Sequence, residues 1–248
     1  MATISLCMIV KNESAVLARC LDSIADLMDE IIIVDTGSTD NTKEIAAQYT
    51  SRIYDFKWTS DFSAARNFSF SKATMEYIYT ADADEILDDA NRERFLRLKD
   101  ALLPEIEIVQ MKYVTQGTFD TALNAKKEYR PKLFRRLRTF TWIDPIHETV
   151  RLTPVTFDSD VEILHCPQSL HSKRDFSIFI KAFEHDGQFS PKIRTMYAKE
   201  LLKTGDKKDF TDAKPIFQLI FDNDPADDAR KEAACVLARI YRMEDNKN

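Results

Sequence analysis

The sequence predicts an α/β fold, in which helices flank a largely parallel sheet, followed by a helical segment. Short apolar runs alternate with stretches of helical periodicity in the N-terminal part, which is the pattern of βαβ units. Two runs, residues 4–10 and 30–34, are too continuously apolar for a strand with a solvated face, so we expect them to be buried on both faces. From residue 172 onward the periodicity is helical. We therefore expect a domain over residues 1–171 and a helical segment over residues 172–248.

The elements of the first domain are expected in alternating order. After the first strand, apolar residues at helical spacing predict a helix around residues 16–24, and Thr39 or Asp40 is a suitable N-cap for the next helix. The remaining expected elements are a helix ending near residue 49, strands at 52–55 and 76–80, a helix at 61–73, long strands at 105–115 and 128–134, and short strands at 149–155 and 161–164. We expect the two long strands to pair antiparallel.

The helical segment contains a repeat signal. The dipeptides Ser190-Pro191 and Asp224-Pro225 stand 34 residues apart, and each precedes a predicted helix with packing residues at regular spacing. The packing residues expected in this part are Tyr197, Leu201, Leu202, Phe210, Ala213 and Phe217. The period resembles a tetratricopeptide repeat, with one full unit and half of another. Because so few repeats cannot bury a core alone, they either pack on the first domain or begin a longer array.

Composition excludes several classes of function. Four glycines among 248 residues are too few for either glycine-rich phosphate loop. A net charge of −6 argues against duplex nucleic acid as a partner. The four cysteines lack the spacing of a metal site, and no apolar run approaches the roughly 18 residues of a membrane helix. We expect a cytoplasmic protein with reduced thiols and no integral membrane segment, with peripheral contact at the inner face of the membrane left open.

Acidic residues cluster where three predicted strands end. These clusters lie at residues 11–13, 35–40 and 82–85. Ligands of open α/β sheets bind at the carboxyl ends of the strands, although Asp, Ser and Thr there are equally common as helix N-caps. Carboxylates that share one crevice repel each other unless a cation or a ligand lies between them. Asp82 and Asp84 are the strongest candidates, because paired carboxylates at a strand end suit a hard divalent ion that bridges two phosphates.

Four segments carry a resemblance to a known family. Residues 5–13, 31–42, 61–67 and 82–84 read SLCMIVKNE, IIIVDTGSTDNT, DFSAARN and DAD. Their sequence and order resemble family 2 glycosyltransferases of the GT-A fold, a Rossmann-like mixed sheet flanked by helices. Within that family the chain looks most like the bacterial branch that includes lipopolysaccharide-core glucosyltransferases and sublancin-type peptide S-glycosyltransferases.

The resemblance implies a site for a UDP-sugar. The backbone near Val10 and the side chain of Glu13 would line the nucleotide pocket, and Asp40 would meet the uracil or its ribose. Asp35 would support the turn, and Asp61 and Arg66 would contact the base or hold the acids in place. Asp82 would bind the ribose or support the metal. Lys173, with His171 and Arg174, would clamp the diphosphate. Buried salt bridges of Arg66 to Asp61 or Asp82, and a solvated helix start for Lys173, are the alternatives.

The resemblance also implies a metal. Asp84 would ligate Mn²⁺ or Mg²⁺, and His165 would complete the site as a histidine does in relatives. A mixed carboxylate and imidazole site favours Mn²⁺ over Ca²⁺. The alternative for His165 is a histidine whose hydrogen bonds are satisfied within the protein.

Transfer with inversion requires a base on the acceptor side. The segment 142–148, WIDPIHE, supplies the candidates. We expect Glu148 to be the base, with His147 and then Asp144 as alternatives. Trp142 would stack on a sugar or fill the core. A basic run, Lys132, Arg135, Arg136 and Arg138, would meet an anionic acceptor or form a solvated edge.

The expected function is therefore inverting transfer of a sugar, glucose or N-acetylglucosamine, from a UDP-sugar to a glycan, lipid-linked or peptide acceptor. The alternative is a non-catalytic module that binds sugar nucleotides or proteins through its repeat-like helices.

Overall fold

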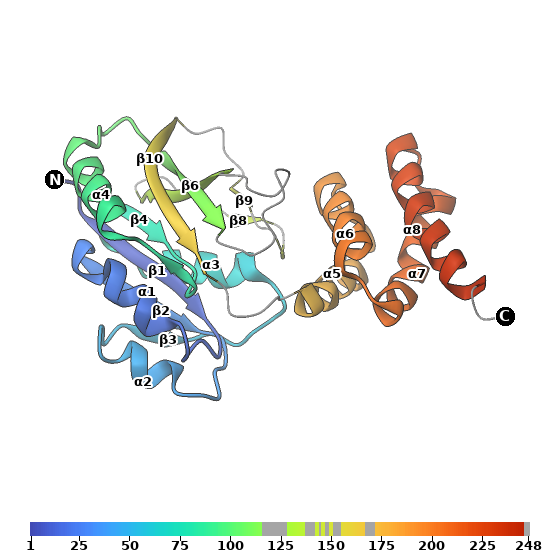
Figure 1. Cartoon of the computed structure of the whole chain (residues 1–248), viewed down its shortest axis with the longest axis horizontal. Helices are drawn as coiled ribbons and strands as arrows, with labels where there is room; N and C mark the ends of the chain where they lie inside the picture. The colour runs from blue at the N-terminus through green and yellow to red at the C-terminus, as the bar shows by residue number, and fades with distance from the viewer. Residues whose placement is uncertain are drawn as a thin grey trace. The chain divides into compact units, whose positions relative to one another are not determined.

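A computed structural model gives the structure of the chain (Figure 1). It describes residues 1–115, 128–136, 142–143, 145–146, 149–150, 155–166 and 172–245. Contacts divide the chain into two compact units. The first is made mainly of residues 1–168 and the second mainly of residues 169–248. The boundary expected between residues 171 and 172 stays a prediction.

Eight strands among the described residues form one mixed sheet. In chain order the strands of the first unit are β1 (Ile4–Val10), β2 (Glu30–Asp35), β3 (Ile53–Asp55), β4 (Tyr77–Thr80), β5 (Glu85–Ile86), β6 (Ile108–Thr115), β7 (Glu128–Arg135) and β10 (Thr156–His165), with β8 (Trp142–Ile143) and β9 (Thr149–Val150) as a separate antiparallel pair. The spatial order is β3-β2-β1-β4-β7-β6-β10-β5. All run parallel except β7 and β5, which are antiparallel to their neighbours.

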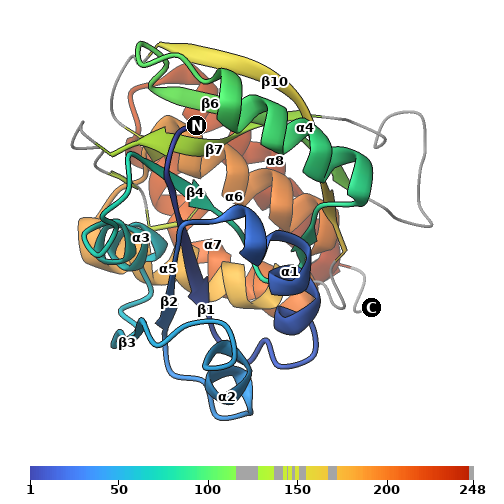
Figure 2. The ribbon, with the colours of Figure 1, turned by 90° about the vertical axis from the view of Figure 1, so that its left-hand side faces the viewer.

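Helices cover both faces of this sheet. They are α1 (Leu17–Ile24), α2 (Thr42–Ala46), α3 (Phe62–Phe70) and α4 (Asp89–Ala101), with a short 3₁₀ helix, η1 (Ala25–Leu27). Leu6 and Met8 of β1 pack with α1, α2 and α4, which lie on one side of the sheet (Figure 2), whereas Cys7 faces the side that carries α3. Alternate residues of β1 thus enter two cores, which is why the strand reads as one continuous apolar run.

The predicted α/β class is confirmed, with two local differences. The antiparallel pairing of β6 with β7 is as expected. The strands expected at 149–155 and 161–164 are instead the short β9 and one ten-residue strand, β10. The first half of β10 is mostly exposed and contains Asp158, Ser159 and Asp160, so it lacks the apolar signal of a strand. The two-residue β5 was not expected, because so short a segment carries no periodicity.

The second unit consists of helices α5 (Ser172–Asp186), α6 (Pro191–Thr204), α7 (Lys207–Asn223) and α8 (Asp227–Asp245). The side chain of Ser190 caps α6, and Asp206 forms a capping box with Asp209 at the start of α7. A Cβ on Gly205 would lie 2.6 Å from the carbonyl oxygen of Leu201, so the tight connection between these helices needs a glycine.

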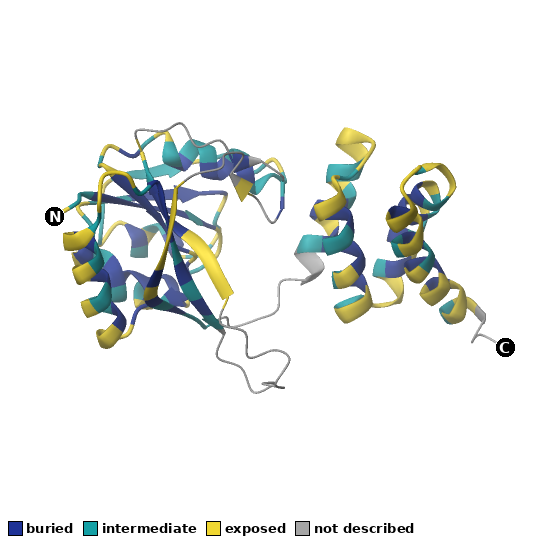
Figure 3. Cartoon of the chain, turned by 90° about the horizontal axis from the view of Figure 1, so that it is seen from above, coloured by how far each residue is buried: buried dark blue, intermediate teal, exposed yellow. Residues whose placement is uncertain are grey.

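Aromatic side chains form the core of the helical unit. The ring of Tyr197 stacks on Phe179 at 4.7 Å and contacts Phe217 at 5.3 Å, measured between ring centroids. Of the packing residues expected here, Leu202 is wrong, because 49% of it is exposed. Figure 3 shows that each unit has buried residues of its own. No helix in the described ranges combines the length and the apolarity that crossing a bilayer requires.

Candidate functional site

The predicted donor-site residues gather at one edge of the sheet. β1 ends at Val10, β2 at Asp35, β4 at Thr80 and β10 at His165, and these parallel strands all point to the same edge (Figure 1). The other described residues predicted for the donor and metal sites of this unit follow these strand ends or lie on α3: Glu13, Asp40, Asp82, Asp84 and Arg66. Asp61 directly precedes α3 in the sequence and groups with the second unit. This is the edge where α/β sheets bind ligands.

The loops after β1 and β2 are hydrogen-bonded to each other. The backbone N–H of Asn12 donates to Ser38 Oγ at 2.9 Å, and the N–H of Thr39 donates to Asn12 Oδ1 at 2.7 Å. Asn12 has a φ of 55°, a left-handed conformation that asparagine tolerates better than most residues. Glu13 lies beside this contact, and its N–H donates to Thr42 Oγ1 at 2.8 Å. The two loops are therefore joined into one rim at this edge of the sheet.

Asp35 organises the turn that follows β2. Its Oδ1 accepts the N–H groups of Gly37 and Ser38, each at 2.9 Å. Gly37 has a φ of +103°, which favours glycine at this point of the turn. Asp35 is 2% exposed, and its Oδ2 has no hydrogen-bond partner among the described residues. This geometry agrees with a residue that supports the turn.

Asp40 closes the same turn with both carboxylate oxygens. Oδ1 accepts from the N–H of Thr42 at 3.1 Å and from its hydroxyl at 2.5 Å, and Oδ2 accepts from the N–H of Ser14 at 3.2 Å. Desolvation opposes ionisation, but the hydrogen bonds from Thr42 and Ser14 outweigh it and lower the pKa of Asp40 to about 2. The carboxylate stays charged and part of the turn.

The turn after β4 leaves its first carboxylate open. The side chain of Asp82 is 52% exposed, and its nearest ion-pair partner is Arg66, with Nη2 at 3.9 Å from Oδ1. Arg66 also donates to Thr80 Oγ1 at 3.0 Å. Although desolvation acts to raise it, the pKa of Asp82 is lowered by the positive charges of Lys132 and Arg66. Asp82 is therefore an exposed, ionised acceptor at the sheet edge.

Asp84 and His165 meet although 81 residues separate them. The short β5 pairs antiparallel with the end of β10, and this places Asp84 Oδ2 2.9 Å from His165 Nε2. The N–H of Cys166 donates to the carbonyl of Asp84 at 2.9 Å, and the ring of Tyr113 lies 5.0 Å from that of His165. Both side chains are partly accessible, 15% for Asp84 and 24% for His165.

This donor set suits a hard divalent ion. One carboxylate and one imidazole are ligands that Mn²⁺ accepts, and Mg²⁺ commonly takes one or two carboxylates with the rest of its shell from phosphates and water. Within the described ranges no group of three or more His, Cys, Asp or Glu residues is placed to hold a metal. Asp84 and His165 therefore fit a metal that the nucleotide helps to coordinate, better than a closed structural site.

A buried ion pair lies behind the acidic turn, and sequence reasoning missed it. Lys132 Nζ donates to Glu85 Oε1 at 2.5 Å, with 6% of the lysine side chain and 2% of the glutamate side chain exposed. Desolvation raises the pKa of Glu85, and Lys132 partly offsets it. Both roles expected of the basic run are wrong for Lys132, because it is buried. Arg135 lies opposite Tyr77 at the amino end of β4, far from the acidic turn, and Arg136 is exposed, as a solvated edge requires.

These side chains lie next to the carboxylates whose mutual repulsion the sequence predicts. Lys132 pairs with Glu85, Arg66 lies near Asp82, and His165 contacts Asp84. The protein itself supplies positive or hydrogen-bonding partners to the carboxylates at the end of β4, so their mutual repulsion is relieved before any ligand binds.

Trp142 belongs to the core. It is 8% exposed and packs edge-on against Phe70 and Phe134, at 5.7 Å and 5.3 Å between ring centroids. The amide of Asn67 forms two hydrogen bonds with its backbone, at 2.9 Å and 3.1 Å, and the guanidinium of Arg66 lies 4.8 Å from its ring. Of the two roles considered for Trp142, the structure supports the core role.

Several predicted residues cannot be placed. Asp144, His147, Glu148, Arg138 and His171 lie outside the described residues, as do the side chains of Lys173 and Arg174 at the start of α5. Their roles stay predictions.

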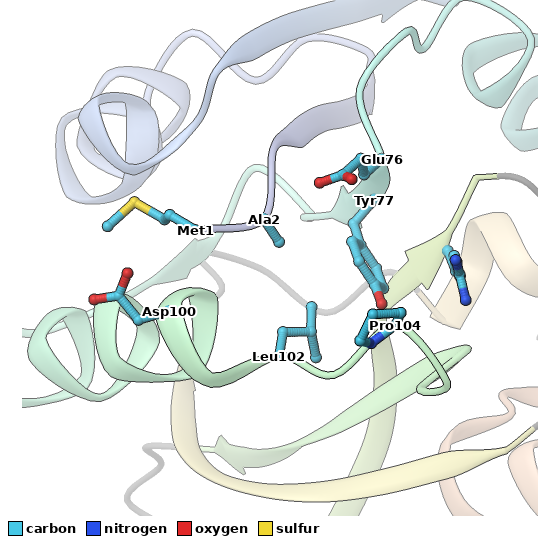
Figure 4. A pocket seen from close by; sticks show the side chains of 8 residues that line it. Met1, Ala2, Glu76, Tyr77, Asp100, Leu102 and Pro104 are labelled. Atoms are coloured by element: carbon cyan, nitrogen blue, oxygen red, sulfur yellow. The ribbon is translucent and has the colours of Figure 1, made fainter.

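A small cavity elsewhere in the first unit is unrelated to this edge. It measures about 160 Å³ and is lined by residues that include Ala2, Tyr77 and Arg135 (Figure 4). It lies at the amino ends of β1 and β4, whereas the predicted site residues follow the carboxyl ends. None of the residues predicted for the donor site, the metal or the base lines it.

Comparison with known proteins agrees with the fold and the motifs. A family model described as glycosyl transferase family 2 matches residues 5–153. The chain is 48% identical over 87 residues to a TPR repeat-containing protein of Synechococcus elongatus, a match that covers 35% of this chain and 22% of that protein. It is 33% identical over 132 residues to the SPbeta prophage-derived glycosyltransferase SunS of Bacillus subtilis, covering 52% of this chain and 31% of that protein.

A third relative is the lipopolysaccharide core biosynthesis glycosyltransferase LpsC of Rhizobium meliloti, 31% identical over 99 residues, which are 38% of this chain and 33% of that protein. The chain thus matches only about a fifth to a third of the length of these relatives.

Solved structures share the fold. Glucosyl-3-phosphoglycerate synthase from Mycobacterium tuberculosis, in complex with Mn²⁺, UDP-glucose and phosphoglyceric acid, has a TM-score of 0.54 at 20% identity, covering 77% of this chain and 82% of that chain. The same enzyme with Mg²⁺ and UDP has a TM-score of 0.52 at 18% identity, covering 77% and 81%.

Proposed function

The chain belongs to glycosyl transferase family 2, and from that premise we propose that it is an inverting, metal-dependent glycosyltransferase that uses a UDP-sugar. Glucose and N-acetylglucosamine are the sugars proposed for transfer, and the acceptor is a glycan, a lipid-linked glycan or a peptide side chain. The observation that carries the proposal is the meeting of Asp84 with His165, beside the exposed Asp82, at the ligand-binding edge of the sheet.

Two observations support a divalent cation at Asp84 and His165. The first is that a carboxylate and an imidazole suit such an ion. The second is that a protein with the same fold has been crystallised with divalent metals. Glucosyl-3-phosphoglycerate synthase was crystallised with Mn²⁺ and UDP-glucose and with Mg²⁺ and UDP. The bound ion would supply charge stabilisation to the leaving diphosphate. Because Asp84 and His165 are only two ligands, the nucleotide and water would supply the others.

The rim formed by the loops after β1 and β2 would hold the nucleoside. In this proposal the backbone near Val10 and the side chain of Glu13 line the pocket, and Asp40 uses its remaining lone pairs toward the uracil or ribose. Asp35 keeps the turn in shape. Further contacts are proposed for Asp61 and Arg66 with the base or the neighbouring acids, for Asp82 with the ribose or in support of the metal, and for Lys173 with the diphosphate.

Inversion needs direct attack of the acceptor on the anomeric carbon. We assign Glu148 as the general base, with His147 and Asp144 as alternatives. The acceptor hydroxyl or thiol loses its proton to the base while its oxygen or sulfur bonds to the anomeric carbon. The bond from that carbon to the diphosphate oxygen breaks, and UDP leaves with the electron pair.

The helical segment, proposed to start at residue 172, would serve the acceptor or a partner. Its tetratricopeptide-like order is compatible with the TPR repeat-containing relative. A cytoplasmic site of action, with a membrane surface as an additional contact, is compatible with four cysteines that are all free in the described part of the chain.

Titration calorimetry with UDP, in the presence and absence of MnCl₂, tests the proposal. We expect UDP to bind more tightly with Mn²⁺, and we expect release of UDP from UDP-glucose or UDP-N-acetylglucosamine. Metal-dependent binding without turnover of either sugar nucleotide would favour the alternative, a non-catalytic sugar-nucleotide module. Absence of UDP binding under both conditions would contradict the donor site itself.

A further inference from the structure

The buried pair Lys132–Glu85 lies directly behind the acidic turn, residues 82–85. Lys132 Nζ contacts Glu85 Oε1 at 2.5 Å. The second oxygen of the same carboxylate, Oε2, accepts the backbone N–H of Asp82 at 3.2 Å. Glu85 therefore links a buried cation on β7 to the backbone of the turn.

Backbone hydrogen bonds and the side chain of Glu85 hold the turn, and Asp84 also contacts His165. The N–H of Glu85 donates to the carbonyl of Asp82 at 3.1 Å, so Glu85 and Asp82 bond reciprocally. The N–H of Cys166 fixes the carbonyl of Asp84. With the backbone anchored in this way, the carboxylate of Asp82 is left 52% exposed and available to a ligand.

A bulge in β7 brings Lys132 to this position. Val109 of β6 pairs with Leu133 and the next residue, Gln110, pairs with Pro131, so Lys132 is the extra residue of the bulge. Such bulges re-aim a side chain and recur next to active sites. Pro131, which cannot donate a ladder hydrogen bond, is tolerated at the same irregularity.

We propose that Glu85 and Lys132 are positioning residues, which hold the 82–85 turn in the one conformation that presents Asp82 and Asp84 to metal-bound UDP. This inference rests on the proposed function. Glu85 acts through its hydrogen bond to the turn, and Lys132 acts by holding the carboxylate of Glu85 in place. Neither residue contacts the metal or the substrate.

A second lysine–carboxylate pair in the same unit, in which the acid is more exposed (37% for Asp29 against 2% for Glu85), provides the control. Lys99 Nζ donates to Asp29 Oδ2 at 2.7 Å, and that oxygen also accepts the backbone N–H of Ile4 at 2.8 Å. The lysine side chain is 7% exposed, close to the 6% of Lys132. Ile4 begins β1, at the edge of the sheet opposite the acidic turn.

The experiment titrates MnCl₂ into protein saturated with UDP, by calorimetry, at a temperature where melting curves show every variant folded. Three double variants are compared with the wild type: K132M/E85A, which removes the pair and its link to Asp82; K132M/E85Q, which is neutral but retains an oxygen that can accept from Asp82; and the control K99M/D29A. We expect K132M/E85A to weaken Mn²⁺ binding about 10–100-fold, the usual effect of losing a partner behind a metal ligand.

K99M/D29A should bind Mn²⁺ like the wild type, even where its melting temperature falls. K132M/E85Q keeps an acceptor for the N–H of Asp82 but loses Lys132, so it should lose affinity for Mn²⁺, but less than K132M/E85A. Wild-type affinity in K132M/E85A, or equal losses in either of the other two variants, would overturn the positioning role. If K132M/E85A does not fold, K132M/E85N replaces it with the same expectation, because asparagine is one methylene too short to reach Asp82. Wild-type protein that binds no Mn²⁺ with UDP would instead refute the proposed function, and the positioning role with it.

Discussion

Two acidic turns lie at the same edge of the sheet, and they use their carboxylates differently. In the turn at residues 35–42, Asp35 and Asp40 accept hydrogen bonds from the turn's own amides and hydroxyls. In the turn at residues 82–85, the backbone is anchored by Glu85, and Asp82 keeps an exposed carboxylate. The aspartates of the first turn hold that turn in its conformation. In the second turn Glu85 holds the backbone, and Asp82 stays exposed.

An acidic residue at a strand end can stabilise its turn or bind a ligand, and a sequence motif does not distinguish these two roles. Substitution of Asp35 should act mainly on stability, and substitution of Asp82 or Asp84 mainly on ligand binding. Acidic residues at a strand end are thus not equivalent, and the number of internal hydrogen bonds that each accepts distinguishes them.

The largest effect is expected for Asp84→Ala. Removal of the proposed metal ligand should abolish turnover and the Mn²⁺ dependence of UDP binding, a loss beyond the roughly 10–100-fold that outer partners of a metal site contribute. UDP-release assays and calorimetry measure both. If UDP binding by this variant still depended on Mn²⁺, Asp84 would not be a metal ligand, and the proposed difference between the two turns would be wrong.

Glu148→Gln should separate donor binding from transfer. The amide cannot accept the acceptor's proton, so transfer should fall by roughly 10²–10⁴ while UDP–Mn²⁺ affinity stays near that of the wild type. Initial rates with a competent acceptor, together with UDP calorimetry, provide the readout. Undiminished transfer would pass the role of base to His147 or Asp144.

Asp35→Ala should lower the free energy of unfolding by about 1–3 kcal/mol, because the N–H groups of Gly37 and Ser38 lose their acceptor. Asp82→Ala, which removes a half-exposed side chain, should change it by less than about 0.5 kcal/mol. Urea unfolding of the two variants makes the comparison. Equal destabilisation by both would show that the turns are held in the same way.

A smaller effect concerns acid stability. The pKa of Asp40 is about 2 in the folded protein, against an ordinary value of 3.8, so the folded state favours the ionised form. The resulting stabilisation is present above pH 3.8 and is lost as the pH falls toward 2. Asp40→Asn, which cannot titrate, should therefore lose less stability than the wild type over this range in unfolding experiments at a series of pH values. A pH dependence identical to that of the wild type would contradict this assignment.

The sequence predicted the parts of the site that strand ends determine. The apolar runs of β1 and β2 locate the sheet, and the rule for ligand edges then places Asp35 and Asp82 together. The meeting of Asp84 with His165 depends on the two-residue strand β5, which has no sequence signal of its own, and only the family resemblance indicated it.

The contact between Lys132 and Glu85 lay beyond sequence reasoning for a physical reason. The two residues are 47 positions apart, and a bulge decides which way Lys132 points. A run of basic residues predicts a solvated surface, because lysine is rarely buried unless it is paired. The sequence pattern does not show that Lys132 has such a partner. The one sequence feature that could have indicated this contact is Glu85, an acidic residue directly after Asp82 and Asp84 for which the predicted site has no role.

A crystal structure of the protein with UDP and Mn²⁺ tests the central claim most directly. The account predicts that the ion is coordinated by Asp84, His165 and diphosphate oxygens, with Glu85 still hydrogen-bonded to the backbone of Asp82 and with Asp35 and Asp40 still bonded within their own turn. A metal bound by Asp35 or Asp40, or an 82–85 turn that leaves Glu85 to reach the ion, would contradict it.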